Sequence, residues 1–331
     1  MKRVLVFLAM ILPLSPASAA EVVPRLRVIV DNDFGGDPDG LFQLAHLLLS
    51  PAVEVRGVIA SRHHAAGFYG FPGNAAHGRK IAADLVALMD RSQAFPLVAG
   101  SEESMETSLD APLSEAATLI RDEALRKDDP RPLFVLCGGG LTDVALALRK
   151  EPLIEDRLTV VWIGGPEHPG TAAPPPGKPR MEYNLSIDPA AGRWIFGDSK
   201  VRLWQVPRNT YRQALVSHAE LRTGLDARGK LGGFLWQSLV DLLKRADGRL
   251  GEAYVLGDNP LVLLTALQSS WEPDAASSVF QEIPAPGIDA AGNYVGSKDG
   301  RMIRVCQEID MRLMMADFFA KVAEFDAAVK P

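Results

Sequence analysis

The chain alternates short runs of almost wholly apolar residues with longer amphipathic runs. Strands that are apolar throughout, rather than at every second position, are buried on both faces and are typical of parallel sheets. Parallel neighbours need crossover connections, which are right-handed and usually helical. The pattern therefore predicts an α/β fold with an open, mostly parallel, doubly wound, Rossmann-like sheet. We expect strands at 27–30, 53–60, 95–99, 133–137, 158–163 and 201–206, helices at 41–49, 74–89, 116–126, 141–149 and 311–325, and a more helical stretch at 215–267.

The first 20 residues differ in character from the rest of the chain. Lys2 and Arg3 precede an apolar stretch at 4–14, and small residues at 17–20 lead to the polar Glu21. This order is typical of a secretory signal peptide, and the apolar stretch is too short for a membrane span. An N-terminal membrane anchor is the alternative. We expect a signal peptide at 1–20 and one α/β domain at 21–331, exported to a bacterial periplasm and without a membrane anchor after cleavage.

Charge and cysteine content exclude several classes of function. The net charge is −6 and no long Lys/Arg run occurs, which argues against nucleic acid as a partner. Cys137 and Cys306 are the two cysteines, and neither has a partner at metal-ligand spacing. A disulfide scaffold and a cysteine zinc site are therefore excluded, and we expect two free thiols.

Four aspartates crowd the end of the first expected strand: Asp31, Asp33, Asp37 and Asp39. The carboxyl ends of strands are where open α/β sheets bind ligands. Carboxylates this close repel one another unless a cation neutralises them, and hard oxygen ligands suit Ca²⁺ or Mg²⁺. Helix capping by Asp37 before Pro38 is the simpler interpretation of one of them, but it leaves the others unexplained.

Three later segments carry polar residues at similar places. A glycine loop at 138–140 follows the fourth expected strand, without the lysine of a P-loop. Glu182 and Asn184 alternate in an expected extended run, so both could face one cleft, and Asp188 is expected to cap the next helix. The segment 257–260 contains Asp258 and opens an apolar helix, where capping is again the simpler interpretation.

Together these segments resemble the inosine/uridine-preferring nucleoside hydrolases. That family opens with a strand ending in D-x-D-x-G-x-D-D, followed by a G-L-T-N loop and an L-A-L-R-x-E-P helix. A strand ending in G-G, an E-F-N-x-x-x-D-P-x-A-A segment and an H-D-P at a helix start come next. The corresponding segments here, in the same order, are 31–37, 140–152, 163–165, 182–191 and 257–260.

The resemblance implies a Ca²⁺-dependent N-ribohydrolase that cleaves a nucleoside or a related ribosyl compound, in a homo-oligomer. It implies that calcium grips the ribose 2′- and 3′-hydroxyls and that Asp33, as general base, takes a proton from metal-bound water. Glu182 and Asn184 would bind the sugar, and Asp37 would also contact substrate. The implied calcium ligands are one backbone carbonyl and four carboxylates: Gly138, Asp33, Asp37, Asp39 and Asp258.

The chain departs from the family pattern at several positions. Pro38 splits the paired aspartates, which leaves open whether Asp37 or Asp39 is the ligand. Gly257 stands where many members have a histidine, and no asparagine occurs near Thr171. His63 and His64 follow the second expected strand, where they could bind substrate or protonate the leaving group; surface-loop histidines are the alternative.

These departures leave two alternatives to the hydrolase hypothesis. The protein could bind a nucleoside or sugar with little turnover, or it could hydrolyse a different glycoside. A strand followed by D-x-D also opens the haloacid-dehalogenase-type phosphatases, but the glycine loop and the segment at 182–184 do not fit that class.

Overall fold

The computed structural model describes residues 22–71, 73–177, 181–269, 278–296 and 300–329, so the predicted signal peptide at 1–20 lies outside the described part. A central sheet has the strand order β3-β2-β1-β4-β5-β6-β12-β9. Its neighbours are parallel except for β12 and β9, which confirms the predicted mostly parallel, doubly wound sheet. The strands are β1 (Leu26–Asn32), β2 (Val53–Ala60), β3 (Leu97–Ala99), β4 (Leu133–Cys137), β5 (Leu158–Ile163), β6 (Arg202–Val206), β9 (Ser278–Pro284) and β12 (Met302–Ile309).

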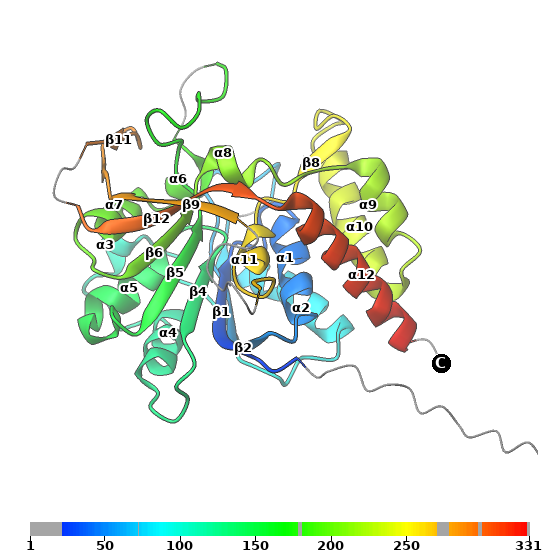
Figure 1. Ribbon diagram of the computed structural model, residues 1–331, viewed down its shortest axis with the longest axis horizontal. Helices are drawn as coiled ribbons and strands as arrows, with labels where there is room; N and C mark the ends of the chain where they lie inside the picture. The colour runs from blue at the N-terminus through cyan, green and yellow to red at the C-terminus, as the bar shows by residue number, and fades with distance from the viewer. Residues whose placement is uncertain (1–21, 72, 178–180, 270–277, 297–299, 330–331) are drawn as a thin grey trace, which may run out of the picture.

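Helices cover both faces of this sheet (Figure 1). Side chains alternate along each strand, so Val28 and Val30 join one buried cluster and Ile29 joins the other. No helix among the described residues is both long and apolar enough to cross a membrane. One layer contains α1 (Asp39–Leu48), α2 (Ala75–Leu88), α9 (His218–Leu225), α10 (Gly229–Arg245), α11 (Pro260–Leu263) and α12 (Met311–Val329); the other contains α4 (Glu115–Leu125), α5 (Thr142–Lys150) and α7 (Pro189–Gly197).

The outer strands β9 and β12 were not expected from the sequence. Polar residues interrupt both strands, and buried positions are mixed with exposed ones, because β9 forms one edge of the sheet and β12 is its neighbour. The rule that identified the central strands, apolar residues throughout, does not apply there. The predicted helical stretch at 215–267 is also interrupted, by the antiparallel pair β7 (Leu215–Ser217) and β8 (Ala253–Val255).

The segment at 182–187 was wrongly expected to be extended. It forms the short helix α6 (Tyr183–Ile187), which begins at Glu182, and Asp188 then caps α7 as predicted by accepting a hydrogen bond from the Ala191 amide. The predicted free thiols Cys137 and Cys306 are both buried and unpaired.

The parallel strands all end at one edge of the sheet, above which α6 and α8 (Arg208–Tyr211) lie in Figure 1. Strand β1 pairs with β2 on one side and with β4 on the other, so the chain changes direction across the sheet beside β1. Connections diverge at such a point and leave a crevice, which is where open α/β sheets bind ligands. The aspartate cluster follows β1 at this point.

Candidate active site

The turn after β1 brings the first aspartates to the mouth of the crevice. Its tightest point is closed by the Gly36 amide, which donates to the Asp33 carbonyl at 2.7 Å. A side chain at Gly36 would lie 3.1 Å from that oxygen, so the turn favours glycine. Helix α1 starts at Asp39 with Pro38 as its N-cap residue, and Asp37 Oδ1 accepts a hydrogen bond from the Asp39 amide at 3.3 Å, so Asp37 contacts the start of the helix one position before the expected cap.

A cavity of about 320 Å³ opens at this edge of the sheet. It brings together all five predicted calcium ligands. Glu182 and Asn184, which were predicted to bind the sugar, line it as well. It also holds residues that the sequence analysis did not select, among them Tyr211 and Arg212. The complete lining is Asp33, Asp37, Asp39, Phe68, Gly138, Ile163, Glu182, Tyr183, Asn184, Tyr211, Arg212, Val255, Gly257 and Asp258.

The aspartates of this cavity are buried or half-buried and have no ion-pair partner among the described residues. Burial raises the pKa of Asp33, Asp39 and Asp258 well above the usual value, and the charges of neighbouring aspartates raise each of them further. Within the described residues no ion pair joins any of these side chains to a lysine or arginine. A bound cation would remove this repulsion.

Asn32 organises the carboxylates from beneath. Its amide nitrogen donates to Asp258 Oδ2 at 2.9 Å, and its amide oxygen accepts from the Asp33 backbone amide at 2.8 Å. Asp258 is therefore tied to β1, and α11 has no side-chain cap, so capping does not explain this aspartate. Asn32 was not predicted as a site residue, although its position between Asp31 and Asp33 could have indicated this role.

Asp31, by contrast, does not line the cavity. It lies one position away from Asn32 on the strand and therefore projects to the opposite face. There it is fully buried, and its pKa is raised by burial and by the charge of Asp143, with a smaller opposing effect of the Ser61 hydroxyl. The cluster of four aspartates is thus divided between the site and the core behind it.

Glu182 is held firmly at the side of the cavity. It is 2% exposed and accepts hydrogen bonds from the Gly165 and Leu185 amides at 2.8 and 3.0 Å. The Tyr211 hydroxyl donates to its second oxygen at 2.8 Å. The Asn184 amide donates to that oxygen as well, at 3.2 Å, so four donors converge on one carboxylate, which orients it and stabilises its charge.

Asn184 lies deeper, between the ends of β4 and β5. Its amide nitrogen donates to the carbonyls of Gly138 and Ile163 at 2.9 and 2.8 Å. A side chain at Gly138 would clash with Asn32, so glycine allows the β4 loop to approach β1 closely. Asn184 therefore contacts the carbonyl that the family resemblance implies as a metal ligand.

Neither of the two predicted substrate-binding histidines lines the cavity. His63 is fully buried beside Gly35, below the turn after β1. His64 is half-buried, its Nδ1 atom accepts from the Ala66 amide at 3.1 Å, and its ring lies 6.4 Å from that of Tyr183. In the described arrangement, Tyr183 stands between His64 and the space that a ligand would fill.

Whether this site fits a metal ion depends on chemistry and on geometry. Across the described residues, no three His, Cys, Asp or Glu side chains are drawn together closely enough to hold one. The donor set nevertheless suits a hard cation, because it consists of carboxylate and carbonyl oxygens and because the buried carboxylates repel one another. The residues present therefore fit a hard cation in the chemistry of their donor atoms, while the side chains would have to move closer together to hold one.

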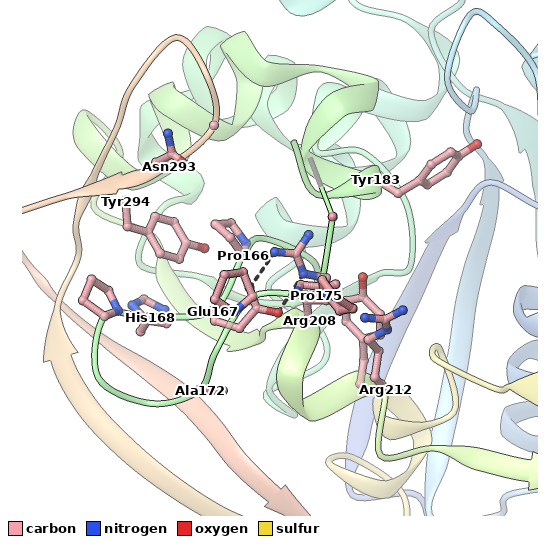
Figure 2. Close-up of a pocket in the computed structure, with 16 residues that line it drawn as sticks. Pro166, Glu167, His168, Ala172, Pro175, Tyr183, Arg208, Arg212, Asn293 and Tyr294 are labelled. Atoms are coloured by element: carbon pink, nitrogen blue, oxygen red, sulfur yellow. Dashed lines mark hydrogen bonds and ion pairs between the residues drawn. The ribbon is translucent and has the colours of Figure 1, made fainter. Parts of the chain in front are cut away.

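A second, larger cavity of about 890 Å³ adjoins the first (Figure 2). The two share Tyr183, Tyr211 and Arg212. His168 and Tyr294 lie at the far end of the second cavity, with their rings stacked at 4.4 Å. The loop at 166–177, which contains three consecutive prolines at 174–176, forms much of its wall.

Comparison with known proteins identifies the family. The family model described as "Inosine-uridine preferring nucleoside hydrolase" matches residues 28–316. The chain belongs to this family. An inosine-uridine preferring nucleoside hydrolase of Leishmania major is 33% identical over 138 residues, which is 40% of this chain and 40% of that protein.

Solved structures of nucleoside hydrolases share the fold. A plant nucleoside hydrolase has a TM-score of 0.68 at 14% identity, covering 91% of this chain and 99% of that one. A purine-preferring ribonucleoside hydrolase from Gardnerella vaginalis has a TM-score of 0.66 at 18% identity, covering 92% and 100%. These matches confirm the predicted nucleoside hydrolase type of the α/β sheet.

Proposed function

We propose that this member of the nucleoside hydrolase family is a calcium-dependent N-ribohydrolase. It would hydrolyse the N-glycosidic bond of a nucleoside or related ribosyl compound, giving free base and ribose. The observation that carries the proposal is the cavity beside β1, which aspartates without an ion-pair partner among the described residues line together with Glu182 and Asn184. The segments that match the Leishmania protein support the reaction class but cover less than half of that protein.

Calcium would be held by the carboxylates at one end of the cavity and by the Gly138 carbonyl. When bound, it would supply positive charge that polarises water and the ribose 2′- and 3′-hydroxyls. The chain offers both Asp37 and Asp39 at this end, and both line the cavity. The carboxylate ligands we propose are Asp33, Asp37, Asp39 and Asp258.

One side chain would act on the attacking water, and the others would bind the sugar. Asp33 would accept a proton from the attacking water, as a general base. Glu182 and Asn184 would bind the ribose, and Asp37 would contact its hydroxyls. Cleavage builds positive charge on the sugar ring, and the carboxylate and amide oxygens of these side chains would stabilise that charge.

The test is base release from a panel of purine and pyrimidine nucleosides, with calcium or with chelator. We expect release only with calcium, and a loss of at least about a hundredfold in kcat for Asp33→Asn, since a positioned base contributes roughly that much or more. Asp128→Asn is the matched control, because Asp128 is exposed and pairs only with Arg126. Undiminished turnover in Asp33→Asn would refute the assignment.

A second candidate is binding of a nucleoside or sugar without efficient turnover. Gly257 favours it, because the family's histidine is absent there and no acid replaces it; a side chain at this position would lie 3.3 Å from Asp39 Oδ2 and from the Tyr211 ring. A nucleoside that raises the melting temperature and is recovered intact after long incubation would support this candidate over the hydrolase.

We further propose export and self-association. The basic, apolar and small-residue segments at 1–20 support export to a periplasm, and the mature domain would begin at 21. N-terminal sequencing of the protein from the periplasmic fraction tests the cleavage point. Light scattering of the purified protein tests the proposed homo-oligomer, and a monomeric mass would contradict it.

A further inference from the structure

The candidate active site continues into a space that a nucleoside alone would not fill. A cavity of about 320 Å³ is at the lower end of the range for small-molecule sites. The adjoining cavity of about 890 Å³ opens from it past Tyr183, Tyr211 and Arg212. Any ligand that occupies the carboxylate end therefore has room to extend past these three side chains.

The charged side chains around the second cavity differ in their partners. Arg208 is bound to Glu167 through two hydrogen bonds of 2.7 and 2.5 Å, shown as dashed lines in Figure 2. Arg212 follows four residues later, at the end of α8, and its side chain forms no hydrogen bond or ion pair with the described residues. Its side chain is exposed and stands where the two cavities meet.

The surroundings of Arg212 leave this positive charge available to a ligand. Burial alone would raise the pKa of Glu167, but Arg208 and Arg212 hold it below the usual value, so this carboxylate is ionised and already engaged by Arg208. His168, the remaining titratable side chain at the far end, has a pKa lowered by burial and is neutral at pH 7. Arg212 is thus the unpaired charge among the described residues that line the second cavity.

We propose that Arg212 binds an anionic group of the substrate, so that the site prefers a ribosyl compound carrying a phosphate or carboxylate over an uncharged nucleoside. The inference rests on the proposed function and narrows its substrate class. The guanidinium matches phosphate and carboxylate oxygens; it lines the same cavity as Glu182 and Asn184 but forms no ion pair with the described carboxylates there. The acidic group could come from the ribose 5′ position or from the base.

Uridine, uridine 5′-monophosphate and orotidine test the inference as a matched set. All three contain a ribose and a pyrimidine ring. Uridine has no acidic group, the monophosphate carries one on the sugar, and orotidine carries one on the base. The measurement is kcat/KM for each with calcium, in the wild type, in Arg212→Gln and in Arg222→Gln. Arg222 is an exposed arginine on α9 that lines neither cavity, so its variant is the control.

We expect one acidic compound to be preferred over uridine and the preference to fall about tenfold in Arg212→Gln, since a charge-assisted hydrogen bond is lost. Preference for the monophosphate places the group on the sugar, and preference for orotidine places it on the base. Equal kcat/KM values for all three compounds, or a preference that Arg212→Gln leaves intact, would overturn the inference.

Binding measurements separate this inference from the proposed function. If none of the three compounds is cleaved, calorimetry compares their Kd values with the calcium-loaded protein. A tighter Kd for an acidic compound that weakens in Arg212→Gln would sustain the anion site while the hydrolase proposal fails. Equal Kd values for the charged and uncharged compounds would overturn the anion site as well.

Discussion

Replacing Asp143 by asparagine should stabilise the protein at pH 7.5, and the gain should shrink as the pH is lowered. Asp143 is 1% exposed behind the active site, and its carboxylate accepts hydrogen bonds from the Ser101 amide and the Ser114 hydroxyl. An asparagine oxygen can accept both. The amide group would remove a buried charge that faces Asp31, whose own pKa is raised by burial and then by Asp143.

The magnitude follows from the shifted pKa. Burial raises the pKa of Asp143 to about 6, from an ordinary value of 3.8, despite the opposing hydrogen bonds. Ionising this group therefore costs stability as the pH rises from about 4 to about 6, and the cost stays constant above that. At about 1.4 kcal/mol per pKa unit, the full cost is about 3 kcal/mol at pH 7.5 and roughly a third of that at pH 4.5.

Melting temperature measured against pH is the assay, with calcium held constant. For a chain of this size we expect Asp143→Asn to melt several degrees higher than the wild type at pH 7.5, and the difference to contract towards pH 4.5. Asp122→Asn is the control, because Asp122 is 60% exposed and pairs only with the adjacent Arg121. A lower melting temperature at pH 7.5, or a difference independent of pH, would refute the reasoning.

Two further predictions concern the carboxylates. The pKa values of Asp33, Asp39 and Asp258 are raised by burial and mutual repulsion, so protein in chelator should lose stability as the pH rises above about 4. Calcium at about 100 times its Kd should restore about 2.7 kcal/mol of the free energy of unfolding. The melting temperature should therefore rise more on calcium addition at pH 8 than at pH 5, and equal rises would contradict this prediction. Asp188 is buried and accepts hydrogen bonds from two backbone amides and a threonine hydroxyl at 2.7–3.1 Å. Asp188→Ala should therefore lower the free energy of unfolding, measured by urea denaturation, by about 2–4 kcal/mol. Asp198 is exposed, so Asp198→Ala should change this free energy little, and similar losses for the two variants would refute the argument.

Much of the fold was predictable because the central strands are buried on both faces. Strand Leu133–Cys137 is apolar at every position and Leu158–Ile163 at every position but Thr159, and this pattern is visible without any tertiary information. The edge strand Ser278–Pro284 and its neighbour Met302–Ile309 are exposed at several positions, so their pattern is mixed and was missed. The helix at Tyr183–Ile187 was missed because it is short and starts from Glu182, whose bonds to distant groups hold it.

The order of the segments also predicted which residues would gather at the site. Asp33, Asp258, Glu182 and Asn184 are separated by up to 225 residues in the chain, yet all line one cavity because each follows a parallel strand or opens a helix at the same edge. His63 did not fit this expectation. It follows β2 as required, but it turns beneath the loop at Gly35 and is fully buried.

Residue types and their order along the chain thus determined the sheet, the family and the position of the carboxylates. Tertiary structure decided which side of β1 each aspartate faces, so that Asp33 enters the cavity while Asp31 meets Asp143 in the core. It also decided that Tyr211 bonds Glu182 and that Arg212 stands unpaired where two cavities meet. The physical reason is that the pattern of apolar residues indicates which positions of a single helix or strand are buried. The partner of a polar side chain, by contrast, depends on elements far away in the sequence.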